Sequence, residues 1–121
     1  MRHGLRGART RSWIWWRGCP SDSNQRQDNS RRIDEELIAI SVENTSGQAT
    51  ATMLNYATHA VVLGPSNLLY SGDHPGASAR QIARARGGVG LYLQGSCGDV
   101  NPLVRRDAVS EIGTFDDCEA I

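Results

Sequence analysis

Three short segments of this sequence hold residue types that can do chemistry, and the first is centred on His59. This histidine follows an apolar, β-prone stretch and comes before a Gly-Pro pair, a position where ligands and catalytic groups often lie. An imidazole in this place is either a metal ligand or catalytic group, or a hydrogen-bonded histidine at the edge of a core. Position alone leaves both interpretations open.

The second segment reads Ser-Gly-Asp-His-Pro-Gly over residues 71–76. A carboxylate at the start of a helix either orients a histidine or caps the helix by accepting a backbone hydrogen bond, and capping needs no function. The pattern favours capping for Asp73. His74 is expected at the surface, at the start of the helix.

The third segment reads Gly-Ser-Cys-Gly-Asp-Val-Asn-Pro over residues 95–102. Its glycines allow close backbone approaches, and backbone N–H groups in such a loop can bind an oxyanion or a phosphate. The same residue types also form ordinary turns, so a simple strand-exit turn is the alternative. The loop has neither the Gly-x-Ser-x-Gly of a nucleophile elbow nor the Gly-Lys-Ser/Thr of a P-loop. For Cys97 a structural thiol is favoured over a nucleophile, because the sequence identifies no base near it.

The elements that position these segments follow from local patterns. Residues 37–42 and 49–56 are β-prone and are separated by the turn signal Asn-Thr-Ser-Gly, which predicts an antiparallel hairpin. A helix is predicted to begin near Pro75, to cover residues 77–86 with Ile82 as its main apolar anchor, and to end at a Gly-Gly pair.

Beyond that helix, residues 89–94 predict a third, buried-looking strand, and Thr114 is placed to cap a last helix. The element order is therefore a β-hairpin followed by a strand-helix-strand unit. This order predicts an α/β fold, a mixed sheet segment that makes up an incomplete domain.

The basic head, residues 1–32, differs from the rest of the chain. It carries eight Arg against two acidic residues, whereas residues 33–121 carry five Arg against eleven acidic residues. The head lacks periodic apolar residues and any nucleic-acid-binding motif, which predicts a disordered segment and no nucleic-acid partner. Its apolar cluster at residues 13–16 is too short for a membrane span or a signal-peptide core.

The three cysteines, Cys19, Cys97 and Cys118, are widely spaced. They form no Cys-x-x-Cys pair, which excludes a zinc knuckle and a thioredoxin-type motif. No disulfide is required, and cysteine usage leaves the compartment undetermined.

Taken together, residues 55–59 (Asn-Tyr-Ala-Thr-His), 71–76 and 93–102 resemble the N-terminal catalytic domain of the neutral/alkaline non-lysosomal ceramidases. They resemble more closely the bacterial proteins of that group, whose substrates are mostly unassigned. The resemblance spans residues 33–121, and it rests on the order and spacing of the segments and on the Gly-Asp-x-Asn-Pro ending.

What the resemblance implies is a zinc amidohydrolase. In the family, zinc held by two His, a Glu and a Tyr activates a water, which attacks the amide carbonyl of an N-acylated sphingoid base. His59 matches one zinc ligand. Asn101 and the backbone of Gly98 and Asp99 would line the site, while Asp73 would support it by a hydrogen bond or cap the helix. The family also suggests a secreted or periplasmic protein, although no signal peptide is visible.

Two departures from the family limit this prediction. The second zinc histidine of the family lies upstream in a His-x-His-Ser-Gly type motif that residues 1–32 lack, and the Glu and Tyr ligands lie beyond residue 121. Ceramidases also carry a serine where this chain has Asn101, and an amide can hydrogen-bond an oxyanion but cannot act as a nucleophile. The sequence thus predicts a partial catalytic domain acting on ceramide or a related N-acyl lipid. The alternative is a non-catalytic or truncated domain that keeps the fold.

Overall fold

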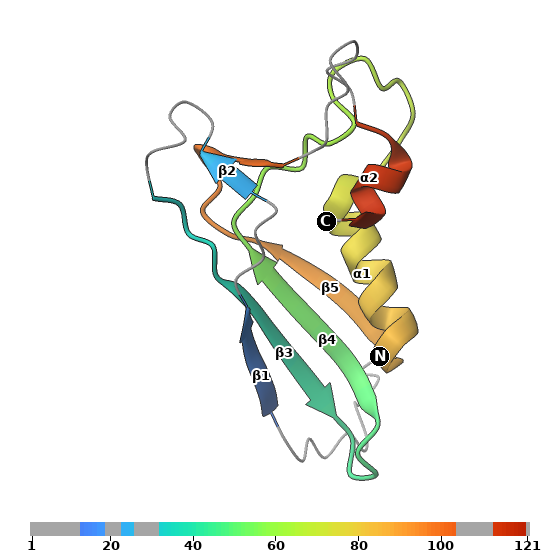
Figure 1. The fold of residues 1–121 in the computed structure, drawn as a ribbon. Helices are drawn as coiled ribbons and strands as arrows, with labels where there is room; N and C mark the ends of the chain where they lie inside the picture. The colour runs from blue at the N-terminus through green and yellow to red at the C-terminus, as the bar shows by residue number, and fades with distance from the viewer. Residues whose placement is uncertain (1–12, 19–22, 26–31, 104–112, 121) are drawn as a thin grey trace, which may run out of the picture.

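A computed structural model of the chain describes residues 13–18, 23–25, 32–103 and 113–120. The described residues form a four-stranded sheet in the order β1-β3-β4-β5, a two-stranded sheet of β2 and β6, and two helices on one side of the main sheet (Figure 1). The predicted α/β class with a mixed sheet is confirmed. The bounds are β1 Trp13–Gly18, β2 Ser23–Gln25, β3 Leu37–Glu43, β4 Ala49–Tyr56, α1 Asp73–Arg86, β5 Val89–Gln94, β6 Val100–Pro102 and α2 Phe115–Ala120.

The predicted hairpin is confirmed as the antiparallel pair β3–β4, in which Ile40 lies opposite Met53. Its turn is held by Asn44, whose Oδ1 accepts the backbone N–H groups of Ser46 at 2.9 Å and Gln48 at 3.0 Å. Asparagine side chains that bond their own turn in this way fix the geometry of the connection. The hairpin is therefore specified by local sequence.

The prediction of a disordered head is wrong for two of its segments. Strand β1 pairs antiparallel with β3 along its whole length, and β2 pairs antiparallel with β6. The three Trp and one Ile of β1 have high β propensity, and β3 offers them a free edge. The strand can therefore pair although its apolar run is short. Apart from Arg32, the rest of the head lies outside the described residues.

The predicted strand-helix-strand unit is confirmed: β5 pairs parallel with β4, and α1 connects them across one face of the sheet (Figure 1). The helix ends at Arg86, as predicted, but it begins at Asp73, earlier than predicted. Ile82 is only partly buried, and the fully buried helix residues are His74 and Ala77. The prediction of Ile82 as the main anchor is thus wrong, because the helix packs through small residues and its first turn.

Glycine at position 90 explains how closely α1 approaches the sheet. A Cβ at Gly90 would overlap the carbonyl oxygen of Ala79 and lie 2.7 Å from Cγ2 of Ile82. The connection before β5 is equally tight, since Gly88 has φ +71° and a Cβ there would lie 2.5 Å from the carbonyl oxygen of Thr50. Backbone therefore meets backbone where α1 crosses β5.

Strand β5 was predicted to look buried, and this is wrong for the face turned away from α1. Val89, Leu91 and Leu93 are 56%, 42% and 49% exposed. Alternate residues of a strand point to opposite faces, and β5 is an edge strand of the sheet. Among the described residues, these three therefore form an uncovered apolar face.

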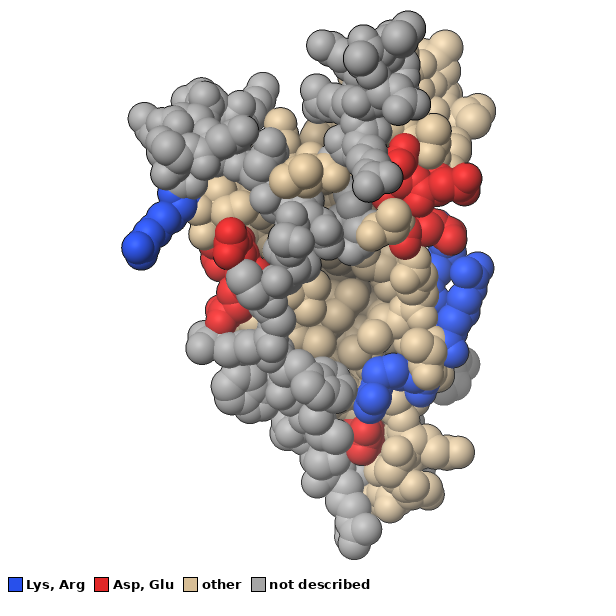
Figure 2. Space-filling view, viewed as in Figure 1, with Lys and Arg blue, Asp and Glu red and all other residues tan. Residues whose placement is uncertain are grey.

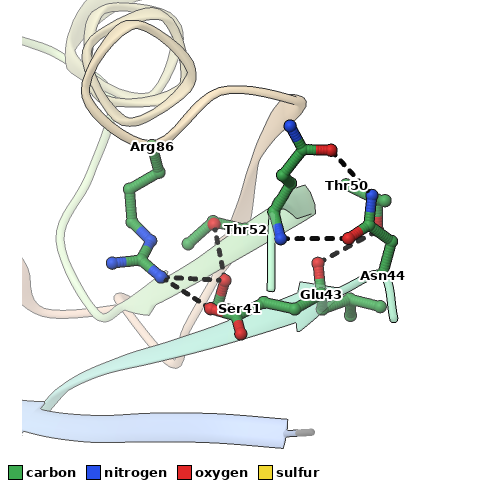
Figure 3. Close-up of polar contacts among 8 residues, drawn as sticks. Ser41, Glu43, Asn44, Thr50, Thr52 and Arg86 are labelled. Carbon is green, nitrogen blue, oxygen red and sulfur yellow. Dashed lines mark hydrogen bonds and ion pairs between the residues drawn. The ribbon is translucent and has the colours of Figure 1, made fainter. Parts of the chain in front are cut away.

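A polar network ties the end of α1 to the hairpin (Figure 3). The hydroxyls of Ser41 and Thr52 lie 3.2 Å apart, and both residues are buried. Arg86 reaches down from the helix, with Nη2 3.1 Å from Oε1 of Glu43 and 3.5 Å from Oγ of Ser41. The positive charge also lies in the last turn of α1, where it suits the helix dipole.

At the other end of α1 a small core forms from Val62, Leu63, Ala77 and Cys118. The predicted cap of the last helix is confirmed: Thr114 Oγ1 accepts the N–H of Asp117, and Asp117 Oδ2 accepts the N–H of Thr114. The Thr114 backbone N–H and its hydroxyl both donate to Oδ2 of Asp117, and these two hydrogen bonds lower the pKa of that carboxyl. Burial raises the pKa of the Cys118 thiol to about 11.

Figure 2 shows the acidic side chains of α2 beside the arginines of α1. The pair Arg80–Glu119 spans 3.9 Å with both side chains about half exposed, so it contributes roughly 0–1 kcal/mol. Apolar packing of Cys118 and Ala77 is the larger attachment of α2.

We expect Gly90→Ala to lower the free energy of unfolding by about 1–3 kcal/mol, because the new methyl group must displace helix backbone. Gly98→Ala is the matched control, since a Cβ there meets nothing within 4 Å. Urea denaturation monitored by circular dichroism measures both. Equal denaturation midpoints for the two variants would show that α1 does not pack as closely as described.

Candidate functional site

The backbone of His59 is fixed on both sides just after β4. Its N–H donates to the Val100 carbonyl at 3.0 Å, and its own carbonyl accepts the N–H of Val61 at 3.0 Å. The same carbonyl lies 3.2 Å from Nε2 of His74. The backbone that carries the His59 imidazole is thus held in place between the exits of β4 and β5.

His74 was predicted at the surface, and this is wrong because the residue is fully buried. The early start of α1 turns His74 onto the sheet, where its ring meets Tyr92 edge-on with centroids 5.5 Å apart. Its Nδ1 is buried with no hydrogen-bond partner among the described residues. Burial lowers the pKa of His74 against the opposing influence of Asp73, so the ring is neutral at pH 7.

Asp73 does not form the predicted cap. The N-cap position is Gly72, and no side chain caps the helix there. The Asp73 backbone has φ 50°, a region that Asp tolerates better than most residues, and its N–H donates to Oγ of Ser71. Its carboxylate instead accepts the N–H groups of Val62 at 3.2 Å, Leu63 at 3.1 Å and His74 at 2.8 Å. Asp73 therefore fastens the loop after His59 to the first turn of α1.

The loop between β5 and β6 is attached to the same strand exit. The N–H of Gly95 donates to the Tyr56 carbonyl at 3.0 Å, and Nε2 of Gln94 donates to the Thr58 carbonyl at 2.8 Å. This attachment brings Sγ of Cys97 to 3.3 Å from Nδ1 of His59. Local sequence identifies no base near Cys97, because His59 lies 38 positions away and only the parallel strand pair brings the two residues together.

A cavity of about 650 Å³ opens beside His59. His59, Asp73 and Asn101 share its wall, so the structure brings together these three residues singled out in the sequence. Gly98 and Asp99 lie exposed in the neighbouring loop and are not in the wall. The full lining is His59, Ala60, Val61, Leu63, Gly64, Pro65, Asn67, Leu69, Ser71, Asp73 and Asn101.

The cavity combines an imidazole and an amide with apolar side chains, which suits an amphipathic ligand. The described residues contain no group of three His, Cys, Asp or Glu that could hold a metal ion. A catalytic zinc takes about three protein ligands, and the described residues around His59 do not supply that number. Within the same residues, no helix is both long enough and apolar enough to cross a bilayer.

The burial of His74 predicts a pH dependence of stability. Its pKa is lowered from 6.5 in the folded chain, so the unfolded chain binds a proton more readily and stability falls as the pH drops through about 6.5 toward the folded pKa. We expect a lower urea midpoint at about pH 5.5 than at about pH 7.5, and His74→Gln should reduce this difference. His59→Gln is the control and should keep it. An undiminished pH difference in His74→Gln would contradict the assignment.

The sequence matches no protein-family model and no curated protein. Solved structures with a similar fold include neutral ceramidase from Pseudomonas aeruginosa, with a TM-score of 0.72 and 18% identity, and a ceramidase complexed with C2, with a TM-score of 0.72 and 17% identity. Each match covers 89% of this chain and 20% of the ceramidase chain. The chain thus spans about a fifth of these proteins, and at this identity the likeness is one of fold. The described residues have the fold of a part of neutral ceramidase.

Proposed function

We propose that this chain is a partial catalytic domain of a zinc-dependent amidohydrolase that cleaves the N-acyl amide bond of ceramide or a related N-acyl lipid. The observation that carries the proposal is that His59 and Asn101 share one cavity wall within a neutral ceramidase fold. A histidine at a strand exit beside an amide matches the arrangement that the sequence resemblance implies.

In this proposal His59 is one zinc ligand, and the other ligands come from a longer protein of which this chain is a part. Bound zinc supplies a Lewis acid and lowers the pKa of a coordinated water toward about 7. The protein's contribution is to hold the imidazole at a fixed place, which the backbone contacts of His59 with Val100 and His74 support.

The remaining residues bind and orient the substrate in this proposal. Asn101 donates from its amide to the carbonyl oxygen of the scissile bond, where negative charge develops during attack. The backbone N–H groups of Gly98 and Asp99 are further donors that the sequence predicts. Val61 and Leu69, both exposed in the cavity wall, contact the start of an acyl chain.

The alternative is a non-catalytic or truncated domain that keeps the fold without activity, and the incomplete set of metal ligands among the described residues fits both proposals. The two proposals differ in what a longer protein must contain. An upstream His-x-His motif and downstream Glu and Tyr ligands support the enzyme. Their absence supports the non-catalytic domain.

We expect the isolated 121-residue chain to bind zinc weakly and to hydrolyse no N-acyl amide above background. A catalytic zinc takes about three protein ligands, and an incomplete site spends its binding free energy on ordering loops. Isothermal titration with zinc and an assay on a fluorescent N-acyl amide test both points. Tight, stoichiometric zinc binding by this chain alone would show that the site lies within it.

In a longer protein that supplies the missing ligands, His59→Ala should lower zinc affinity by more than about 10–100-fold, the range typical of weaker, indirect changes. Hydrolysis should fall with it. Thr45→Ala, in the exposed hairpin turn at the opposite end of β4, is the control and should change neither quantity. An unchanged zinc affinity in His59→Ala would overturn the ligand assignment.

A further inference from the structure

The contact between Cys97 and His59 is not explained by the proposed function. Sγ of Cys97 lies 3.3 Å from Nδ1 of His59, within hydrogen-bond range for sulfur. Cys97 is only partly buried, but its loop is held by two backbone hydrogen bonds, from Gly95 to Tyr56 and from Val100 to the Cys97 carbonyl, each 3.0 Å. The thiol is therefore presented to the ring from an ordered loop.

The ring of His59 needs such a contact to keep one orientation. Its backbone is fixed by Val100, Val61 and His74. Backbone anchoring leaves the side-chain torsions free, and the terminal torsion of histidine is broad. Among the described residues, the Cys97 thiol makes the hydrogen bond that holds a ring nitrogen of His59.

The chemistry of the two partners decides where the ring proton sits. A neutral imidazole carries one proton, on either Nδ1 or Nε2, and the partner of one nitrogen determines the role of the other. The thiol can donate its S–H to Nδ1 or accept from Nδ1–H, because sulfur is a weak donor and a weak acceptor. Of the two arrangements, Nδ1–H donating to Sγ is the one that leaves Nε2 free to bind a metal, as the proposed function requires. With the proton on Nδ1, the lone pair lies on Nε2.

We propose that Cys97 is a positioning residue for His59: it accepts a hydrogen bond from Nδ1–H, fixes the ring orientation and tautomer, and leaves the Nε2 lone pair to face the cavity. His59 lines that cavity and Cys97 is not among its lining residues, as this arrangement requires. The same observation argues against Cys97 as a nucleophile, because a nucleophilic thiol must reach the bound substrate.

The positioning of the ring stands on the described contact, whereas the choice of tautomer and its value for metal binding rest on the proposed function. Metal-binding histidines usually donate their second ring N–H to a carboxylate, a carbonyl or a water. Here a thiol takes that place. Cys97→Ala should accordingly lower the zinc affinity of a longer, ligand-complete protein by about 10–100-fold, as removal of such partners does.

Nitrogen NMR of the 121-residue chain with labelled histidine tests the positioning directly and without metal. The chain has three histidines, and His59→Gln identifies the signals of His59. At about pH 8, above the ordinary histidine pKa, the wild-type chain should show His59 protonated on Nδ1. Cys97→Ala should return it to the Nε2–H form that free histidine prefers. Ser96→Ala, the exposed neighbour in the same loop, is the matched control and should behave as wild type.

Cys97→Ser, whose hydroxyl can accept the same hydrogen bond, should keep the Nδ1–H form, which a purely steric role of the thiol would not predict. Nε2–H in the wild type, or an unchanged tautomer in Cys97→Ala, would overturn the proposal. Zinc added to a ligand-complete protein provides a separate readout. If His59 signals do not respond to zinc while the Cys97→Ala tautomer change is seen, the metal assignment fails and the positioning role stands.

Discussion

The first turn of α1 is fastened to the exit of β4, and the cavity depends on this attachment. Asp73 accepts three backbone N–H groups, two of them from Val62 and Leu63 in the loop that forms the cavity wall. Hydrogen bonds to a charged acceptor contribute roughly 1.5–3 kcal/mol each, more than neutral ones. The buried ring of His74 holds the His59 carbonyl from below. Together the two side chains join the loop after β4 to the first turn of α1.

The parallel pairing of β4 and β5 supplies the second half of the arrangement. Parallel strands bring their exit loops to the same rim of a sheet, which is where ligands bind in open α/β folds. Gly90 makes the pairing compatible with a helix packed closely above it, since any side chain there would meet the Ala79 carbonyl. Gly90 thus lets α1 pack closely on the middle of β5 while β5 stays paired with β4. That pairing brings Cys97 close to His59 at the end of the two strands.

Short sequence motifs predicted those elements whose hydrogen bonds lie within a few residues of the motif. The Asn44 turn, the Gly-Gly end of α1 and the Thr114 cap all bond within a few residues of themselves, so a short stretch of sequence contains the whole cause. The burial of His74 and the pairing of β1 depend on residues distant in sequence, and local patterns pointed the wrong way for both. The candidate site shows the same division. His59 and Asn101 were singled out by residue type and motif and share a cavity wall, whereas the Cys97 contact depends on the three-dimensional pairing of the strands.

The side chains around the cavity also bear on how hydrolysis would proceed there. Asn101 offers an amide, which can stabilise charge but cannot attack. Ser71 lines the cavity, but its hydroxyl accepts the Asp73 N–H, and no hydrogen bond joins it to His59 among the described residues. A serine without a base at hydrogen-bond distance is a poor nucleophile. The His59 ring is engaged at Nδ1 by Cys97, a thiol that does not reach the cavity. In the proposed hydrolysis the attacking group is therefore a water. Cys97 then orients the His59 imidazole, and Asn101 binds the carbonyl oxygen of the substrate.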